Sequence, residues 1–384
     1  MLFKSKIIPF ILKKEQILNT IFTLIFIVWA RFFGLFVVLP VLSVYVSGNK
    51  IEIGLAVGAY ALSQIIFSAP FGRLSDKIGR KNALIIGLVI FALGSLMCAF
   101  STSVEMLILG RFVAGCGAIG AVASAFIADL VPDNEKSKYM AFLGVGVGFS
   151  FVAAMIVGPV LAKFFGLSSL FILCIILCVL NLILLLFVKE PKREIRGLNN
   201  SSLTLMKNKN LIILSLSNFL QKGFLNIFFV SLGLILVENL SFERGNLWQI
   251  YSISTIFGFF AMGVAGAFGD KKGKAKELFF SSVLIFILSI STILFAISQK
   301  SIFLFFVAAI LFFVAFSLQE PILQSQTAKL NKANRGAMLG ILNGFGYAGS
   351  FVGSLFGAFS DLIFYIMLVF CCVWIIILRR LDRI

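Results

Sequence analysis

Four charged side chains lie inside otherwise apolar stretches of the sequence, where they are the residues best able to do chemistry. Glu320 follows the run FFVAFSLQ, and Arg31, Arg111 and Lys222 each interrupt a comparable run. An ionised group at the centre of a bilayer costs about 3 kcal/mol on insertion scales. Because burial disfavours the charged form of a carboxylate, such a group can bind and release a proton as its surroundings change. Glu320 is therefore a candidate proton carrier. The alternatives are a salt bridge to a cation on a neighbouring span and a position nearer the membrane surface.

Other kinds of chemistry lack the residues they need. The sequence has no histidine, so proton transfer must rest on carboxylates. Its six cysteines lie in apolar runs without metal-ligand or redox spacing, and no metal site is predicted. No GxxxxGK[ST] loop occurs, so we expect neither an enzyme nor a cofactor, but a protein driven by the proton gradient. Pro321, directly after Glu320, is expected to interrupt its helix and to expose carbonyl groups to a cavity.

Polar residues on several apolar runs predict a cavity. Asn218, Lys222 and Asn226 recur at i, i+4 and i+8, on one face of a helix. This face either lines the cavity or packs on a polar neighbour, and Arg31 and Arg111 either face the cavity or brace helices. With three buried cations against one carboxylate, the cavity should prefer anionic or zwitterionic solutes. Further candidates, chosen by helix position, are Tyr60, Gln64, Asn343 and Tyr347.

The elements that must position these groups are membrane-spanning helices. The chain has 384 residues, of which 60% are hydrophobic and 13% charged, and its mean hydropathy is +1.08. These values exclude an ordinary soluble domain. Twelve apolar runs reach the roughly 20 residues that a span needs. They cover residues 17–46, 52–71, 82–100, 103–130, 137–163, 168–188, 211–237, 246–269, 277–298, 301–328, 336–359 and 362–379.

A repeated segment indicates that the chain consists of two similar halves, and a basic linker divides six spans from six. GRLSDKIGRK at 72–81 is matched by GAFGDKKGKAK at 266–276, and each is expected to form a tight turn at the membrane surface. The matched pairs are Gly72 with Gly266, Asp76 with Asp270, Gly79 with Gly273, and Arg80 with Lys274. The predicted fold is an all-α membrane protein of 12 transmembrane helices in two pseudo-symmetric six-helix bundles. The predicted divisions are an N-terminal bundle at 1–188, a cytoplasmic basic linker at 189–210 and a C-terminal bundle at 211–384.

The distribution of basic residues predicts orientation. Most of the 33 Lys and Arg residues lie in the termini and loops of one membrane face. The opposite loops hold Lys50, Lys163, Arg244 and Lys300. The positive-inside rule then places both termini in the cytoplasm, in the inner membrane of a bacterium. The net charge of +17 is explained by lipid headgroups, and no nucleic-acid partner is expected. The expected partners are membrane lipids, protons and a small-molecule substrate, bound by a monomer.

Glycines spaced four apart predict close helix packing. They occur as Gly54 with Gly58, as Gly340 with Gly344, and as Gly349, Gly353 and Gly357. Helix surfaces lined by glycine lack protruding side chains, so the two halves can also slide or rock against each other there.

The segment at 72–81 resembles the signature loop of the major facilitator superfamily, G-x-L-a-D-r-x-G-r-k. Its fixed points are Gly72, Leu74, Asp76, Gly79, Arg80 and Lys81. The run LILGRFVAGCGA, from Leu107, resembles the family's fourth-helix motif through Arg111 and Gly115. The run AMIVGP resembles the antiporter motif of the drug/proton antiporter branch through Gly158 and Pro159, although alanines stand at 154 and 162, where that motif usually has glycine.

The resemblance implies roles for these residues. Gly72, Asp76, Gly79, Arg80 and Lys81, together with Asp129, correspond to a latch that holds the two halves together on the cytoplasmic side in the outward-open state. Arg80 is expected to reach Asp129. The alternative is a set of solvated loop charges. Arg111 corresponds to an arginine linked to proton transfer, and Gly158 and Pro159 to the antiporter motif.

The sequence therefore predicts a secondary active transporter that exports small organic or drug-like molecules in exchange for protons by alternating access. A proton-coupled importer of an anionic metabolite is the alternative within transport. A lipid flippase or a non-transporting receptor on the same fold is the alternative from another class.

Overall fold

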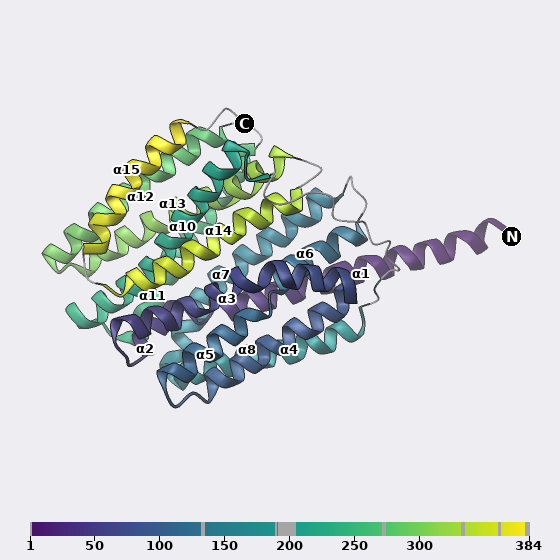
Figure 1. Cartoon of the computed structure of the whole chain (residues 1–384), viewed down its shortest axis with the longest axis horizontal. Helices are drawn as coiled ribbons and strands as arrows, with labels where there is room; N and C mark the ends of the chain where they lie inside the picture. Colours follow the sequence, from purple (N-terminus) through teal and green to yellow (C-terminus); the bar gives the residue numbers. More distant parts are fainter. Residues whose placement is uncertain are drawn as a thin grey trace.

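The computed structural model describes residues 2–131, 135–188, 190, 205–270, 274–331, 335–359 and 362–380. Within these residues the chain is helical and contains no strand. Long helices lie side by side in two groups, and the start of α1 extends away from them (Figure 1). Among the described residues, twelve helices are long and apolar enough to cross a membrane, which confirms the predicted fold class.

The first half consists of the helices before the basic linker. Its elements are α1 (Leu2–Phe36), α2 (Leu39–Tyr45), α3 (Lys50–Ile78), α4 (Arg80–Ala99), α5 (Val104–Cys116), α6 (Ile119–Leu130), α7 (Lys136–Phe165) and α8 (Leu167–Leu186). α1 and α2 together form one span, as do α5 and α6. Of the predicted linker at 189–210, residues 189 and 191–204 lie outside the described residues, so its extent stays a prediction.

The second half follows the linker. Its elements are α10 (Lys209–Leu234), η1 (Ile235–Asn239), η2 (Arg244–Asn246), α11 (Leu247–Ala265), η3 (Gly266–Asp270), α12 (Ala275–Gln299), α13 (Ile302–Leu330), α14 (Arg335–Gly357) and α15 (Leu362–Arg379). Gly273 of the repeated segment is outside the described residues. α13 runs unbroken through Pro321, so the predicted interruption is wrong. Neighbouring helices in a membrane can satisfy the backbone group that proline leaves free.

The ends of the helices define two faces. We call the end that carries the connection between α3 and α4 the basic face, and the end that carries the connection between α2 and α3 the opposite face. The predicted ten-residue turn at 72–81 is wrong in extent, because α3 continues to Ile78 and α4 begins at Arg80. Only Gly79 lies between them, at φ +94°. A side chain strains such a backbone conformation, whereas glycine adopts it freely.

The two halves contact each other mainly through α3 with α14, α7 with α11, and α2 with α10. Ser43 Oγ donates to the Phe229 carbonyl at 3.1 Å, and Lys163 Nζ donates to Asn246 Oδ1 at 3.1 Å. A Cβ on Gly54 would lie 2.8 Å from the Ser354 carbonyl oxygen, which confirms the predicted close packing at that glycine. These contacts lie between the centre of the helices and the opposite face.

The glycines of α14 divide this helix into two parts. Gly349, Gly353 and Gly357 pack against the backbone of α10, as their spacing predicted. Gly340 and Gly344 have open space where a side chain would begin, so the prediction that they pack is wrong. The glycines of α14 are therefore in close contact with α10 near the opposite face and border open space near the basic face.

Two spans of the first half are interrupted. α1 ends at Phe36 and α2 begins at Leu39, while α5 ends at Cys116 and α6 begins at Ile119. Gly158 of α7 packs on the first interruption, because a Cβ there would collide with the Val37 carbonyl oxygen. The glycine of the antiporter-like motif thus lets α7 approach the broken span.

Candidate substrate and proton-coupling site

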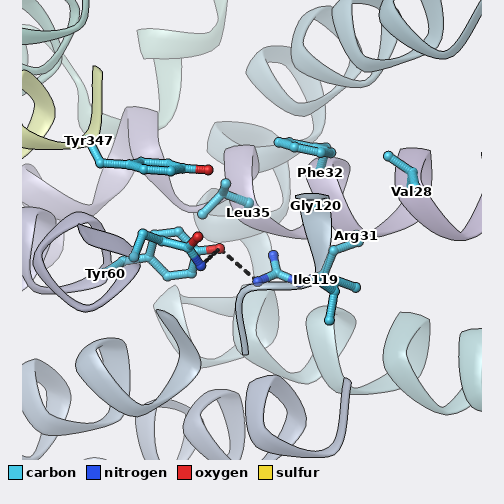
Figure 2. A pocket seen from close by; sticks show the side chains of 9 residues that line it. Val28, Arg31, Phe32, Leu35, Tyr60, Ile119, Gly120 and Tyr347 are labelled. Atoms are coloured by element: carbon cyan, nitrogen blue, oxygen red, sulfur yellow. Dashed lines mark hydrogen bonds between the residues drawn. The ribbon is translucent and has the colours of Figure 1, made fainter. Parts of the chain in front are cut away.

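A pocket at the boundary of the two halves brings together four of the predicted cavity residues. Arg31 lies on α1, Tyr60 and Gln64 on α3, and Tyr347 on α14 of the second half. Figure 2 shows the Tyr60 and Tyr347 side chains with Leu35 drawn between them, and the guanidinium of Arg31 directed at the Tyr60 hydroxyl. The remaining lining residues are Val28, Phe32, Leu35, Ile119 and Gly120.

Arg31 is held by neutral groups. Its Nη2 donates to the Tyr60 hydroxyl at 2.7 Å, and its Cζ lies 3.5 Å from the centre of the Phe91 ring. A guanidinium over an aromatic face gains a favourable cation–π interaction. The residue is only 5% exposed, and its Nε has no hydrogen-bond partner.

Gln64 connects Tyr60 to the broken fourth span. Its Nε2 donates to the Tyr60 hydroxyl at 3.1 Å and to the Gly115 carbonyl at 2.7 Å. That carbonyl is available because α5 ends at Cys116 and its last carbonyl groups lack partners within the helix. The interruption of the span therefore fixes one wall of the pocket.

Arg111 lies behind the same tyrosine. It is 3% exposed, its Nε donates to the Ala56 carbonyl at 3.3 Å, and its Cζ is 5.3 Å from the Tyr60 ring centre. Its Nη2 has no partner. Among the described residues, no carboxylate forms an ion pair with Arg31 or Arg111. The first half thus contains two buried positive charges without a paired acid.

The second half holds its partly buried charges as a pair. Lys222 Nζ of α10 lies 2.7 Å from Glu320 Oε2 of α13, and their side chains are 25% and 27% exposed. Lys222 Nζ is also 4.9 Å from the centre of the Phe316 ring. The structure shows the salt bridge that the sequence left open as an alternative for Glu320. It does not test whether Glu320 carries a proton.

Three other predicted cavity residues lie outside this pocket. Asn218 is buried and donates to the Leu342 carbonyl at 2.7 Å, which joins α10 to α14. Asn226 donates to the Lys222 carbonyl at 3.0 Å. Asn343 is exposed and accepts from Gln324 Nε2 at 3.3 Å. Asn218 therefore fits the packing alternative.

Phenylalanines connect the halves next to these charges. The Phe151 ring of α7 lies 6.0 Å from Phe313 and 6.2 Å from Phe316 of α13, and 6.4 Å from Phe229 of α10. Phe316 thus contacts both the first half and Lys222. The sequence analysis missed this cluster among 45 phenylalanines. The helical spacing of Phe312, Phe313 and Phe316 is a signal for one side of it.

The latch residues form a cluster at the basic face. Arg80 makes ion pairs with Asp76 at 2.9 Å and with Asp129 at 3.3 Å, and it donates to the Ser75 hydroxyl. The expected contact between Arg80 and Asp129 is confirmed. These pairs join α3, α4 and α6 within the first half. Gly72 has open space around it.

Glu190 belongs to this cluster and was missed. Its carboxylate accepts the backbone N–H of Arg80 at 2.5 Å and that of Lys81 at 3.1 Å, which caps the start of α4. Lys81 Nζ donates to the Val188 carbonyl at 2.8 Å. An acidic residue directly after the sixth span, within a basic stretch, was the available signal.

A protein with twelve spans, two halves and a polar pocket at their boundary has the architecture of a secondary transporter. The family model of the Major Facilitator Superfamily matches residues 21–354. The chain belongs to this family, and it is a membrane transporter. The resemblance of the segment at 72–81 is thereby confirmed at the level of the family.

Known relatives support the same conclusion. The inner membrane transport protein YajR of Escherichia coli is 32% identical over 90% of this chain and 76% of its own length. A class H tetracycline resistance protein of Pasteurella multocida is 40% identical over 35% of this chain and 34% of its own length. The crystal structure of a D-xylose–proton symporter matches 94% of this chain and 97% of its own with a TM-score of 0.80, at 17% identity.

Proposed function

We propose that this transporter exports small organic molecules in exchange for protons and uses the proton gradient without a cofactor. The observation that carries the proposal is the Lys222–Glu320 ion pair, which lies inside the second half beside the interface ring of Phe316. The partial similarity to a tetracycline resistance protein favours export of a drug-like solute. In this proposal the basic face is the cytoplasmic face of a bacterial inner membrane, with both termini inside.

Coupling follows from what a proton does to the pair. When Glu320 is ionised, it forms a salt bridge with Lys222, and the pair is neutral overall. Protonation of Glu320 removes that attraction and leaves Lys222 with an uncompensated charge. The two protonation states therefore differ in the packing they favour around Phe316 and the first half. A ligand or proton that binds two conformations unequally shifts their populations, as alternating access requires.

Rocking of the halves is supported by the packing between them. The described contacts near the opposite face are close, such as Gly54 against Ser354, while Gly340 and Gly344 of α14 have open space. We propose that Gly72, Asp76, Gly79, Arg80, Lys81 and Asp129, with Glu190, control the closing of the basic face. Arg111, buried beside Tyr60, would supply a permanent positive charge in the first half while Glu320 gains and loses its proton.

The direct test uses purified protein in liposomes with a trapped pH dye and an imposed proton gradient. A panel of amphipathic drugs and organic anions is added to the wild-type protein, Glu320→Gln and Glu105→Gln. Glu105 is an exposed acid near the opposite face and serves as the matched control. We expect a compound that moves protons through the wild-type and control proteins but not through Glu320→Gln. Proton movement that survives Glu320→Gln would contradict coupling through this residue.

The direction of exchange separates the export proposal from the importer. In an antiporter, the compound and the protons move in opposite directions, so loading the compound inside drives proton entry. In a symporter they move together, and the same loading drives proton exit. Measuring both the labelled compound and the pH in one experiment decides between them.

A further inference from the structure

We propose that the pocket around Arg31 binds the transported molecule through a negatively charged group, so that the substrates are small organic anions. This inference rests on the proposed transport function and names its substrate class. Its starting point is the juxtaposition of Arg31, Tyr60, Gln64 and Tyr347 at the boundary of the halves.

The two buried arginines of the first half favour a bound anion. Arg31 and Arg111 are 5% and 3% exposed, and arginine keeps its charge in proteins. Their described partners are a tyrosine hydroxyl, a backbone carbonyl and aromatic rings, all of which are neutral. Burying a charge without a counter-charge is costly. A bound anion supplies the missing negative charge, whereas a cation would add to the repulsion.

The hydrogen-bonding groups of the pocket are donors in need of an acceptor. Arg31 Nε is buried without a partner. The Tyr60 hydroxyl already accepts from Arg31 Nη2 and from Gln64 Nε2, so its own proton is free to be donated. A carboxylate, sulfonate or phosphate offers several acceptor oxygens and forms short, charge-assisted bonds with a guanidinium.

The other walls of the pocket select an organic body. Phe32, Leu35 and Ile119 line it with apolar side chains, and the aromatic ring of Tyr347 reaches into it from the second half (Figure 2). A fully hydrated inorganic ion would gain nothing from these walls. An anion with an aromatic or branched apolar body covers them, while its charged group reaches Arg31.

An anionic substrate has an electrical consequence for the exchange. Export of a monovalent anion and entry of one proton both move positive charge inward. A membrane potential that is negative inside therefore accelerates the cycle. A neutral substrate exchanged for a proton would carry half that charge.

Binding is tested with three compounds of the same shape: 1-naphthoate, 1-naphthamide and 1-naphthylmethylammonium. Each is added to purified full-length protein in neutral detergent, and the shift in thermal unfolding is followed as a function of its concentration. We expect stabilisation by the carboxylate alone. Arg31→Gln should weaken that binding by about tenfold or more, because a charge-assisted hydrogen bond is lost. The control is Arg244→Gln, which changes an exposed arginine, and it should bind like the wild type.

A second variant keeps the test valid if Arg31→Gln unfolds. Arg31→Lys retains the charge and should still prefer the carboxylate over the amide, with weaker binding. Equal stabilisation by the amide or the ammonium compound would overturn the inference, as would no response to the carboxylate. If cationic compounds drive proton movement that depends on Glu320, the proposed function stands and the anion assignment fails. If naphthoate binds through Arg31 while no compound moves protons, the anion assignment stands and the proposed function fails.

Discussion

The two halves of the molecule hold the cations inside their spans in different ways: the two in the first half are buried, and the one in the second half is partly buried. In the first half, Arg31 and Arg111 contact hydroxyl, carbonyl and aromatic groups, without an ion-paired carboxylate among the described residues. In the second half, Lys222 lies against the carboxylate of Glu320. The described cations of the first half therefore lack a paired acid, whereas the cation of the second half is paired with the carboxylate to which the proposed function assigns the proton. This difference suggests a division of work, with substrate bound mainly by the first half and protons by the second.

Removing the carboxylate of the second half should have the largest effect on stability and on proton coupling. Glu320→Ala leaves Lys222 without its partner and should lower the free energy of unfolding by about 3 kcal/mol. The double variant Lys222→Met/Glu320→Met removes both charges and should recover most of that loss, while proton coupling stays abolished. Thermal unfolding in detergent and proton movement in liposomes measure the two effects. A double variant as unstable as the single one would mean that packing, not charge, explains the loss.

A side chain at the boundary of the halves should have the next largest effect. Gly54→Val places bulk where a Cβ already lies 2.8 Å from the Ser354 carbonyl oxygen, at a cost of about 2 kcal/mol in the packed state. The halves should then separate at the opposite face. In a cysteine-free background, spin labels on exposed Ile51 and Phe359 should report a longer mean distance.

The matched control for this separation is Gly344→Val, since that glycine has open space around it. The control should leave the distance between the spin labels unchanged. An equal change in both variants would show that the distance reflects a general perturbation and not the contact at Gly54.

The charge of the first half should matter less for stability. Arg31→Met removes the hydrogen bond to Tyr60 but also a buried charge without a described counter-charge. The two effects oppose each other, so the free energy of unfolding should change by less than about 1 kcal/mol. Thermal unfolding beside Glu320→Ala measures the contrast. A loss as large as that of Glu320→Ala would remove the distinction between the halves.

The smallest effect is expected at the exposed contact between the halves. Lys163 Nζ lies 3.8 Å from Glu243 Oε2, with side chains 40% and 73% exposed. Such surface pairs contribute at most about 0.5 kcal/mol and are screened by salt. Lys163→Gln should therefore lower the thermal unfolding temperature only slightly, and this decrease should be smaller still at high salt. A large, salt-independent loss would show that the pair holds the halves together.

The positions of the spans were predictable because a bilayer fixes the length of its helices. The twelve predicted runs agree with the observed helices to within a few residues at most ends. The contact between Arg80 and Asp129 was predictable through the resemblance of the segment at 72–81 to a family motif. That resemblance supplied tertiary information that the residues alone do not contain.

Other features depend on packing that a single sequence does not reveal. Helix position selected Tyr60, Gln64 and Tyr347 for the pocket, but it also selected Asn343, which lies outside it. The pairing of Lys222 with Glu320 requires knowing that α10 and α13 are neighbours. The interruption of the first span had a local signal that the sequence analysis did not use, because Pro40 lies in the first turn of α2. The interruption of the fourth span contains Gly117 and no proline, which is a weaker signal.

The interruption of the fourth span gives the latch cluster a mechanical meaning. α6 begins at Ile119, which lines the pocket, and reaches the basic face near Asp129, where Arg80 holds it. Arg111 lies on α5, on the other side of the joint. If the latch acts as proposed, release of Asp129 lets α6 swing about this joint and widens the basic end of the pocket. In the proposed mechanism the basic end of the pocket opens through a bend in one short helix, while Arg31 of α1, the residue proposed to contact the substrate, keeps its place.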